Sequence, residues 1–418
     1  MWNLALKNIL YYKGRSITTF MLTFISAWLF IVYVALMDGS HKSMLENSLK
    51  VYQTPIALYT KGYRDEGGVD YLIYDVEYIS KHLNKIPQVD SYTPRYETFG
   101  LLSNKEQSSA AMMVGIYPDK EAKVTVLKKS LIKGRYLAQN DANQIYMGKE
   151  LAQRLKLNIG QSVAFIGSGV DGSFASDIFE VVGIFKTGLF DFDSSAIFIN
   201  KSYLDTLLYT ENIASYIAVN VNNLHEARAI NQAISQDLNS TYESLSYYTL
   251  MKDMIDMLKI DSIFGYISIS LFYIVIFFVI MIYGFVNVST RIKEFGLLGA
   301  IGLSNAQIRL LLFYEIFILS TLAIIIATPI GGYIAYYYSI HPIVIEGISE
   351  TYKDYGIVSD EMPLSFDIFT ICWNVMVVYV LNLLSILYPM SYLSKFRPVE
   401  ALSHVWSYSK TLPSQPSL

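Results

Sequence analysis

Cysteine is nearly absent from this sequence. Cys372 is the only one in 418 residues, and it lies in an apolar run. A lone cysteine excludes an intramolecular disulfide and a thiolate metal cluster. Charged residues are also scarce, at 16% of the chain beside 53% hydrophobic residues, which is too apolar for an ordinary soluble protein. The composition therefore predicts a membrane protein that carries a soluble part.

Motifs for catalysis and nucleotide binding are missing too. The sequence contains no G-x-x-x-x-G-K-[ST], so the chain cannot bind ATP through a P-loop of its own. Its five histidines are scattered, which argues against a metal site. Basic residues do not cluster away from the apolar stretches, which argues against a nucleic-acid surface. We expect no catalytic residue, no metal and no cofactor bound by this chain, and no nucleic acid among its partners.

The sequence does contain four long apolar stretches. A bilayer core needs roughly 20 apolar residues in a helix, and residues 17–40, 263–290, 316–340 and 368–390 are long enough. Basic residues flank these spans: Lys7, Lys13, Arg15, Arg291, Lys293, Arg309, Lys395 and Arg397. By the positive-inside rule, both termini and residues 291–315 are predicted to be cytoplasmic.

This topology assigns every other segment to one side of the membrane. Residues 1–16 are predicted to form a cytoplasmic interfacial helix and residues 391–418 a cytoplasmic tail. Residues 341–367 form a short, acidic extracytoplasmic loop. Residues 41–262 are long enough to bury a core of their own. The predicted fold is an α-helical membrane protein with four transmembrane helices and a large extracytoplasmic α+β domain inserted between helices 1 and 2.

Two kinds of periodicity within residues 41–262 predict the α+β character of the domain. Strands are predicted at residues 55–60, 95–102, 110–117, 161–167, 177–185, 195–200 and 214–221. Helices are predicted at residues 75–86, 148–157, 201–209 and 223–238. Helical spacing also continues from both ends of the domain toward the adjoining spans, which predicts stalk helices; flexible tethers are the alternative. Residues 167–176, GSGVDGSFAS, are typical of a hairpin tip.

The cytoplasmic loop keeps helical spacing as well. Phe295, Leu298 and Ile301 recur at i, i+3 and i+6, and Ser304 can cap the helix that follows. Because glycines interrupt the path between the two helices, we predict a short helix at the membrane surface and then a sharp turn. Glu315, at the start of the third span, is expected to pair with Arg309 or Arg291.

Two motifs carry a resemblance to a known family. Residues 291–308 are similar to the pattern R-x-x-E-[IF]-G-x-L-x-A-x-G-x-x-x-x-Q-I, and the tail YPMSYLSKFRPVEAL is similar to a YP…P-x-E-A-L ending. Both patterns belong to the ABC transporter permease superfamily of macrolide exporters, cell-division permeases and lipoprotein-releasing permeases. The order of one span, a large external domain and three more spans also resembles this superfamily, over nearly the whole chain.

Within the superfamily, the sequence is most similar to lipoprotein-releasing permeases of the LolC/LolE type. The stretches that carry this likeness are PRYETFGLLSN, MGKELAQRLKLNIGQSV and EVVGIFKTGLFDFDSSAIFI. The sequence departs from the LolC pattern at the hairpin, which in LolC is a long hook that recruits a periplasmic carrier. Here a short hairpin takes its place, and its carrier-facing residues would be Gly167, Ser168, Gly169, Gly172 and Phe174.

The resemblance implies a mechanism that depends on other proteins. A separate cytoplasmic ABC ATPase dimer would bind ATP and Mg, and a second permease subunit, identical or a paralogue, would complete the transporter. A helix within residues 294–308 would couple the ATPase to the spans. The implied coupling residues are Arg291, Glu294, Gly296, Gly299, Ala300, Gly302, Gln307 and Ile308.

The resemblance also implies where substrate would enter. An acylated lipoprotein would pass sideways from the membrane lipids into a cavity between the first spans of two subunits. The residues expected to line this cavity are Phe24, Trp28, Phe30, Tyr33, Phe264, Ile267 and Leu271, although these side chains could equally face lipid.

The functional hypothesis is therefore a permease subunit in the bacterial inner membrane that makes no chemistry itself. Driven by its ATPase, it would extract lipoproteins from the outer leaflet and release them toward a periplasmic carrier. Two alternatives stay open: a cell-division-type regulator that moves a wall hydrolase and carries nothing, and an exporter of small amphiphiles or peptides.

Overall fold

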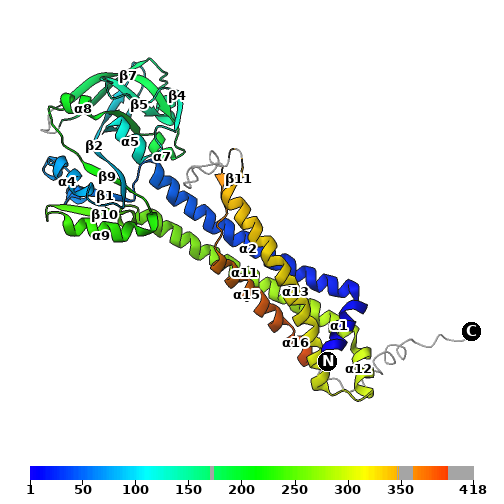
Figure 1. The fold of residues 1–418 in the computed structure, drawn as a ribbon. Helices are drawn as coiled ribbons and strands as arrows, with labels where there is room; N and C mark the ends of the chain where they lie inside the picture. Colours follow the sequence, from blue (N-terminus) through cyan, green and yellow to red (C-terminus); the bar gives the residue numbers. More distant parts are fainter. Residues whose placement is uncertain (170–173, 346, 348–360, 394–418) are drawn as a thin grey trace, which may run out of the picture. The chain divides into compact units, whose positions relative to one another are not determined.

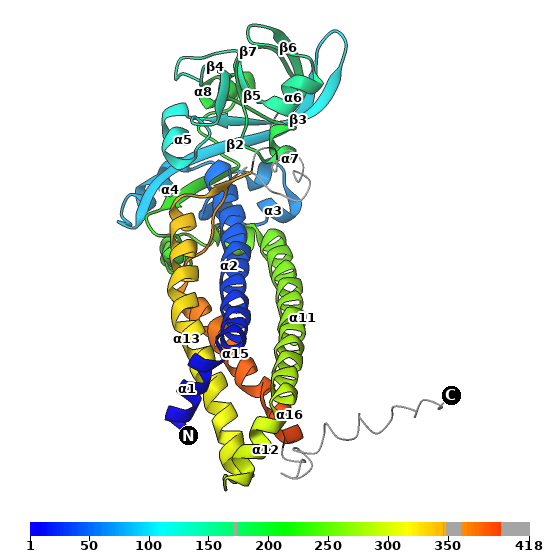
Figure 2. The same cartoon turned by 90° about the vertical axis from the view of Figure 1, so that its right-hand side faces the viewer.

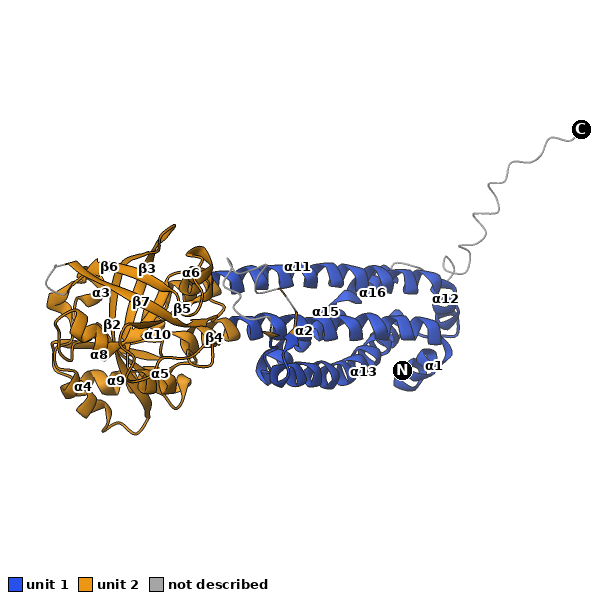
Figure 3. Cartoon of the chain, turned by 90° about the horizontal axis from the view of Figure 1, so that it is seen from above, with its two compact units in different colours: residues 1–41, 259–343, 362–418 blue, residues 42–258, 344–361 orange. Residues whose placement is uncertain are grey.

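The computed structural model describes residues 1–169, 174–345, 347 and 361–393. By its internal contacts the chain divides into two units (Figure 3). Unit 1 comprises residues 1–41, 259–343 and 362–418, and unit 2 comprises residues 42–258 and 344–361. Each unit has a core of its own.

Unit 1 is helical and contains the apolar spans (Figure 1). In the described part of the chain, four helical segments are long and apolar enough to cross a membrane. The helices are α1 (Trp2–Tyr11), α2 (Lys13–Val51), α11 (Lys252–Thr290), α12 (Ile292–Ala300), α13 (Asn305–Ile340), α15 (Ile368–Ser385) and α16 (Leu387–Leu393). Two short strands, β11 (Ile343–Val344) and β12 (Glu361–Met362), pair where the units meet in the sequence.

The four long helices of unit 1 pack around shared apolar residues and run side by side (Figure 2). One cluster takes Ala27 and Phe30 from α2, Ile269 from α11, Ala327 from α13 and Val378 from α15. Small residues at such contacts let helix backbones approach closely in a membrane. Buried polar side chains bond across the bundle, as the hydroxyl of Tyr273 donates to Asn374 Oδ1 at 2.7 Å.

Helices α2 and α11 are each 39 residues long, more than a bilayer needs. A span of about 20 residues leaves the rest of each helix outside the hydrocarbon. Both helices continue from unit 1 into unit 2, because the unit boundaries fall at residues 41/42 and 258/259. The stalks, which are the parts of α2 and α11 that lie in unit 2, are thus helical and continuous with the spans. Leu49 of α2 packs in a core of unit 2.

Unit 2 is built on a single mixed sheet of ten strands. Its order is β10-β1-β9-β2-β3-β8-β5-β7-β4, with β6 pairing β2 and β7. The strands are β1 (Ile56–Thr60), β2 (Val89–Ser103), β3 (Ser108–Ile116), β4 (Leu131–Gly134), β5 (Gln144–Gly148), β6 (Ser162–Ser168), β7 (Phe174–Phe185), β8 (Ala196–Asn200), β9 (Tyr216–Val221) and β10 (Tyr242–Ser246). The parallel pairs are β3–β8 and β5–β7, and the other pairs are antiparallel.

Short helices cover this sheet in two groups. They are α3 (Tyr63–Glu66), α4 (Val76–Leu83), α5 (Pro118–Val124), α6 (Lys149–Arg154), α7 (Phe190–Asp193), α8 (Lys201–Leu207), α9 (Ala227–Asp237) and α10 (Tyr247–Leu250), with 3-10 turns at Val69–Tyr71 and Leu224–Glu226. Helices α4 and α9 pack with β1 and β9 in one core, and α6 and α8 pack with β5, β7 and β8 in another. The 15-residue strand β2 pairs with β9, which packs in the first core, and with β3, which packs in the second. It therefore joins the two halves of the sheet.

The predicted fold class is confirmed: four candidate membrane helices with a large α/β domain between the first and second. Three strands of the ten-stranded sheet were missed by the sequence analysis, namely β4, β5 and β10, as was the short pair β11 and β12. Strand β5 is almost entirely buried and only five residues long, so it shows no alternation between apolar and polar positions that would identify it.

Candidate functional site

Helix α12 and the turn after it form the most sharply defined local structure in the segment between α11 and α13. Gly302 follows the helix with φ +107°, in the left-handed region that favours glycine. The N–H of Leu303 donates to Leu298 O and that of Gly302 to Gly299 O, both at 3.1 Å. These two bonds make a Schellman motif, which satisfies the last carbonyls of the helix.

The next helix starts with an equally specific cap. The side chain of Ser304 accepts the N–H of Gln307, and the side chain of Gln307 accepts the N–H of Ser304 at 2.8 Å, which is a capping box. Turn and cap together reverse the chain between α12 and α13 within a few residues. The sequence pattern predicted this arrangement of a short helix and a sharp turn.

Arg291, at the start of α12, is the centre of a buried ion cluster. Its Nη1 donates to Glu315 Oε2 of α13, and its Nε donates to Glu294 Oε2, both at 2.8 Å. The side chains of Arg291 and Glu315 are only 6% and 9% exposed. Of the two partners expected for Glu315, the structure thus pairs it with Arg291, and Arg309 is exposed instead.

Two N-terminal helices complete the cluster. From α1, Asn8 Nδ2 donates to Glu315 Oε1 at 2.7 Å, and the hydroxyl of Tyr12, just after α1, donates to Glu294 at 2.6 Å. From α2, Arg15 lies 3.8 Å from Glu315. Helices α1, α2, α12 and α13 are therefore held together through two carboxylates. A satisfied buried network of this kind fixes one geometry, because each unpaired group would be costly.

The charges in the cluster keep each other ionised. Burial lowers the pKa of Arg291, but the charge of Glu315 and the hydrogen bonds to both carboxylates outweigh it and the pKa is raised. Burial likewise opposes ionisation of Glu294, yet the hydrogen bonds from Arg291 and Tyr12 hold the pKa of this carboxyl below its usual value. Arg291 and Glu294 are thus charged at neutral pH.

The cluster orients α12 so that its other face is open. Phe295 and Gly296 are buried, and Phe295 packs with Ile308 and Leu312. On the opposite face Lys293, Leu297, Ala300 and Ile301 are exposed, at the i, i+4, i+7 and i+8 spacing of one helix stripe. We call these four residues the α12 stripe. Leu297 is 56% and Ile301 71% exposed, so the stripe presents two apolar side chains at the surface of the described chain.

The residues predicted to couple this segment therefore divide into two groups. Arg291, Gly296 and Ile308 are buried, and Glu294 and Gly299 are half-buried, so they shape and hold the segment. Ala300, Gly302 and Gln307 are exposed. The sequence analysis grouped Ile301 with Phe295 and Leu298, but the structure buries Phe295 and exposes Ile301 on the other face. It also missed Leu297 as an exposed residue, and Asn8 and Tyr12 as members of the cluster. A helical projection of residues 292–301 would have separated the stripe from the buried face.

The seven residues expected to line a substrate cavity do not lie together in this chain. Phe30 is buried in the bundle and its ring lies 4.3 Å from that of Tyr273, centroid to centroid. Phe24 and Trp28 are half-buried, and the buried Nε1 of Trp28 has no hydrogen-bond partner within the described ranges. Tyr33, Phe264, Ile267 and Leu271 are exposed on α2 and α11. The first three thus belong wholly or partly to the bundle interior, whereas the last four form its outer surface.

The predicted hairpin is formed by β6 and β7. Gly167 and Ser168 end β6, and Phe174, which begins β7 opposite Ser168, is 91% exposed. Gly172 lies outside the described residues. On one face of the sheet, exposed apolar side chains continue across neighbouring strands; they are Phe99 and Leu101 of β2, Ile166 of β6, and Phe174 and Ile178 of β7. We call these five residues the hairpin face.

With this geometry described, comparison with known proteins identifies relatives of both units. Residues 16–237, more than half of the chain, match the family described as MacB-like periplasmic core domain. Residues 266–398 match the family described as FtsX-like permease C-terminal. The two matches together cover most of unit 2 and at least part of each of the four candidate membrane helices.

Individual relatives are distant. The chain is 24% identical over 229 residues to the lipoprotein-releasing system transmembrane protein LolC of Xylella fastidiosa, strain Temecula1, covering 53% of this chain and 55% of that protein. The LolC of strain 9a5c gives the same identity and coverage. The chain thus spans about half the length of the curated relatives it matches.

Solved structures of similar external domains are also known. One is the periplasmic region of MacB from Actinobacillus actinomycetemcomitans, with 16% identity and a TM-score of 0.37, covering 51% of this chain and 97% of that one. Another is the extracellular domain of the noncanonic ABC-type transporter YknZ from Gram-positive bacteria, with 17% identity and a TM-score of 0.34, covering 46% of this chain and 99% of that one.

Proposed function

Because the chain belongs to the family of FtsX-like permeases with a MacB-like periplasmic core domain, we propose that it is the permease subunit of an ATP-driven ABC transporter that extracts lipoproteins from the outer leaflet of the inner membrane. A separate ATPase dimer would bind ATP and Mg and drive it. The observation that carries this proposal is the α12 stripe, an exposed apolar helix face fixed by a buried ion cluster.

The α12 stripe has the properties of a coupling surface. A rigid helix that presents Leu297 and Ile301 beside Lys293 can insert apolar side chains into a groove of a partner protein. The ion cluster connects the same helix to α1, α2 and α13, so a displacement of α12 would reach two of the long helices directly. The topology that we propose places this segment and both termini in the cytoplasm and unit 2 in the periplasm.

Lipoprotein extraction is a task that needs such coupling. Removing acyl chains from a bilayer costs about 0.8 kcal/mol per methylene, so three chains require tens of kcal/mol, partly offset by an apolar receiver. We propose that substrate enters between α2 and α11 of this subunit and the same helices of a second permease subunit, identical or paralogous. The exposed apolar residues of α11 support this assignment, since they lack a partner helix within the described chain.

Photo-crosslinking in membranes tests the proposed substrate. With a photoreactive residue at Phe264 or Leu271, both exposed on α11, we expect capture of an acylated protein that ATP and the ATPase release. The same probe at Phe30, inside the bundle, and at Trp373, exposed on α15, should not capture it. Capture of a wall hydrolase by unit 2, with no lipid-modified protein at α11, would instead favour mechanical signalling. Capture of only small amphiphiles at α11 would favour export of those compounds.

Changing Gly302 to valine tests the geometry of the turn. Gly302 has φ +107°, and an added Cβ would meet nothing within 4 Å, so backbone strain is the expected cost rather than a clash. One to two kcal/mol of strain, about a 5- to 30-fold change in an equilibrium, should weaken ATPase binding by that factor while the permease still inserts. The amount of ATPase that co-purifies measures the effect. Gly14→Val, at an α2 glycine with open space around it and no positive φ, is the matched control.

The hairpin face is our proposed contact for a periplasmic lipoprotein carrier. Its exposed residues are apolar, whereas a carrier for acyl chains must itself present an apolar surface. Changing Ile166 and Ile178 to serine should reduce transfer of lipoprotein to the carrier several-fold, with ATP hydrolysis intact. Transfer assays with purified carrier measure this. Ile132→Ser on β4, a comparably exposed isoleucine away from the hairpin face, should have no effect; equal loss in both variants would remove the assignment.

A further inference from the structure

The end of helix α2, which lies in unit 2, is bonded to the sheet and its connections through carbonyl groups in and just after its last turn. The N–H of Val126 donates to Lys50 O at 2.9 Å, and Arg95 Nη1 of β2 donates to Tyr52 O at 2.6 Å. The carbonyls at a helix C-terminus carry partial negative charge and lack partners within the helix. A buried guanidinium there acts as a charged cap on a 39-residue helix.

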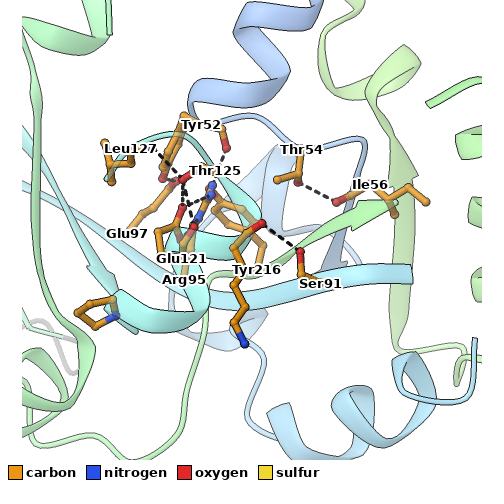
Figure 4. Close-up of polar contacts among 12 residues, drawn as sticks. Tyr52, Thr54, Ile56, Ser91, Arg95, Glu97, Glu121, Thr125, Leu127 and Tyr216 are labelled. Atoms are coloured by element: carbon orange, nitrogen blue, oxygen red, sulfur yellow. Dashed lines mark hydrogen bonds and ion pairs between the residues drawn. The ribbon is translucent and has the colours of Figure 1, made fainter. Parts of the chain in front are cut away.

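Arg95 is itself held by an ion pair without any solvent exposure (Figure 4). Its Nη2 donates to Glu121 Oε1 at 2.6 Å and its Nε donates to Glu121 Oε2 at 3.0 Å, the bidentate geometry that arginine forms with carboxylates. Nη1 also donates to the Tyr216 hydroxyl at 3.0 Å, and Thr125 donates to Glu121 at 2.9 Å. These bonds connect β2, α5 and β9 to the helix end.

The side chain of Tyr52 adds a second attachment to the same helix end. Its ring lies against the guanidinium, with Arg95 Cζ 4.4 Å from the ring centroid, and its hydroxyl donates to Glu97 of β2. The ring of Phe192 lies 4.8 Å from that of Tyr52. Backbone and side chain at this one position therefore both bind the sheet through residues of β2.

The segment after Tyr52 is also hydrogen-bonded to the residues that precede the second stalk helix, α11. The N–H of Tyr247, which begins α10, donates to Pro55 O at 2.8 Å. Helix α11 starts a few residues later, and Met251 N–H donates to Tyr247 O. The end of α2 is therefore bonded to β2, and the turn before α11 is bonded to Pro55, three residues after Tyr52.

Stability alone does not explain a fully buried ion pair, because apolar residues of similar volume at the same positions often stabilise the folded state as well or better. What it provides is a defined geometry, since any displacement leaves charges unpaired. We propose that Arg95 and Glu121 are positioning residues that form a rigid joint between the end of α2 and the sheet, so that movement of the helix is passed on to the external domain. The joint exists independently of cargo, but its use in transport rests on the proposed function.

Hydrogen exchange on the full-length protein tests the joint itself. In the double variant Arg95→Met/Glu121→Leu, both charges are gone and the Tyr52 carbonyl loses its cap, so amides of residues 48–51 should exchange about tenfold faster. The matched control is Arg135→Met/Asp141→Leu, which removes another bidentate pair, at 2.7 and 2.9 Å, from an exposed site. Unchanged exchange at residues 48–51 in the folded Arg95 double variant would overturn the proposal.

A second variant decides the matter if the double variant does not fold. Arg95→Lys keeps a charge beside Glu121 but cannot make the bidentate bond and the bonds to Tyr52 and Tyr216 together. We expect faster exchange at residues 48–51 in this variant too, with unchanged exchange in α6, which packs in the other core of unit 2. Equal exchange in Arg95→Lys and the parent protein would overturn the joint.

A functional readout separates a joint from a merely structural contact. In the reconstituted transporter, the double variant should hydrolyse ATP at near the parent rate but release several-fold less lipoprotein for each ATP hydrolysed. A parent transporter that releases no lipoprotein would refute the proposed function and leave the exchange result standing. A double variant that shows faster exchange yet an unchanged ratio would refute the role of the joint in transport.

Discussion

Replacing Arg291 with methionine is expected to abolish stable ATPase binding while the permease still inserts into the membrane. The substitution leaves the buried carboxylate of Glu315 with Asn8 and a distant Arg15 as its remaining partners. Breaking a buried pair by removing one member costs about 3–5 kcal/mol. If most of this free energy is lost from the interactions that hold α12 in place, the affinity for the ATPase should fall at least about a hundredfold. The ATPase retained per permease on an affinity column measures the loss.

Two companion variants make the Arg291 result specific. Arg309→Met removes the same charge from the same segment at an exposed position, and it should retain the ATPase. Arg291→Met/Glu315→Gln removes both buried charges and should recover part of the binding, because no unpaired carboxylate remains. Equal ATPase retention in Arg291→Met and the parent protein would show that the ion cluster does not position α12.

Replacing Arg95 alone with methionine should be the most destabilising single change in unit 2. The side chains of Arg95 and Glu121 have no exposed surface, so Arg95→Met leaves the carboxylate of Glu121 buried without its ion-pair partner. Within the described structure, Thr125 is then the one other side chain that donates a hydrogen bond to this carboxylate. We expect the free energy of unfolding of the external domain to fall by about 3–5 kcal/mol. Pulse proteolysis in urea can measure this on the full-length protein, because cleavage follows the unfolded fraction of the domain.

The double variant Arg95→Met/Glu121→Leu supplies the contrast. It removes both charges, so its loss of stability should be clearly smaller than that of Arg95→Met. A double variant that is as unstable as the single one would mean that packing around the guanidinium, rather than charge pairing, accounts for the stability. This comparison also establishes whether the double variant is folded well enough for the exchange experiment.

The sequence predicted the membrane fold well because apolar length is a strong signal. Four runs of about 20 apolar residues leave little choice of topology, and the motif at residues 291–308 added the family, which residues 16–237 and 266–398 confirm. Hydropathy alone does not show that α2 runs unbroken from Lys13 to Val51, because its last turns are polar. Helical spacing beyond the first span did predict a stalk helix there, and the structure has one continuous helix.

The sequence predicted where the candidate site lies but not which side chains contact one another in it. Gly302 and the Ser304 cap follow from local rules of helix termination, and the structure has both. The partner of Glu315 could not be chosen between two arginines, because the choice depends on where α11 ends relative to α13. Tyr12 and Asn8 were not foreseen at all, since they meet the cluster only through tertiary packing across about 300 residues of sequence.

The predicted cavity residues show a similar limit. Phe24, Phe30 and Phe264 look alike in the sequence, because periodicity in a span that is apolar all round does not say which face meets another helix. The structure places Phe30 inside the bundle and Phe264 on its surface. The role of the exposed group as a cavity lining remains a prediction about a second subunit.

The most direct test of the account is a crosslink from the α12 stripe. A photoreactive residue at Leu297, which is exposed, should capture the cytoplasmic ATPase in intact membranes, and the same residue at the buried Phe295 two positions earlier should not. The account predicts that this crosslink forms at Leu297 and changes in yield with ATP. Failure to capture any ATPase at Leu297, in a permease that still transports, would contradict the claim that this helix receives the energy of the nucleotide cycle.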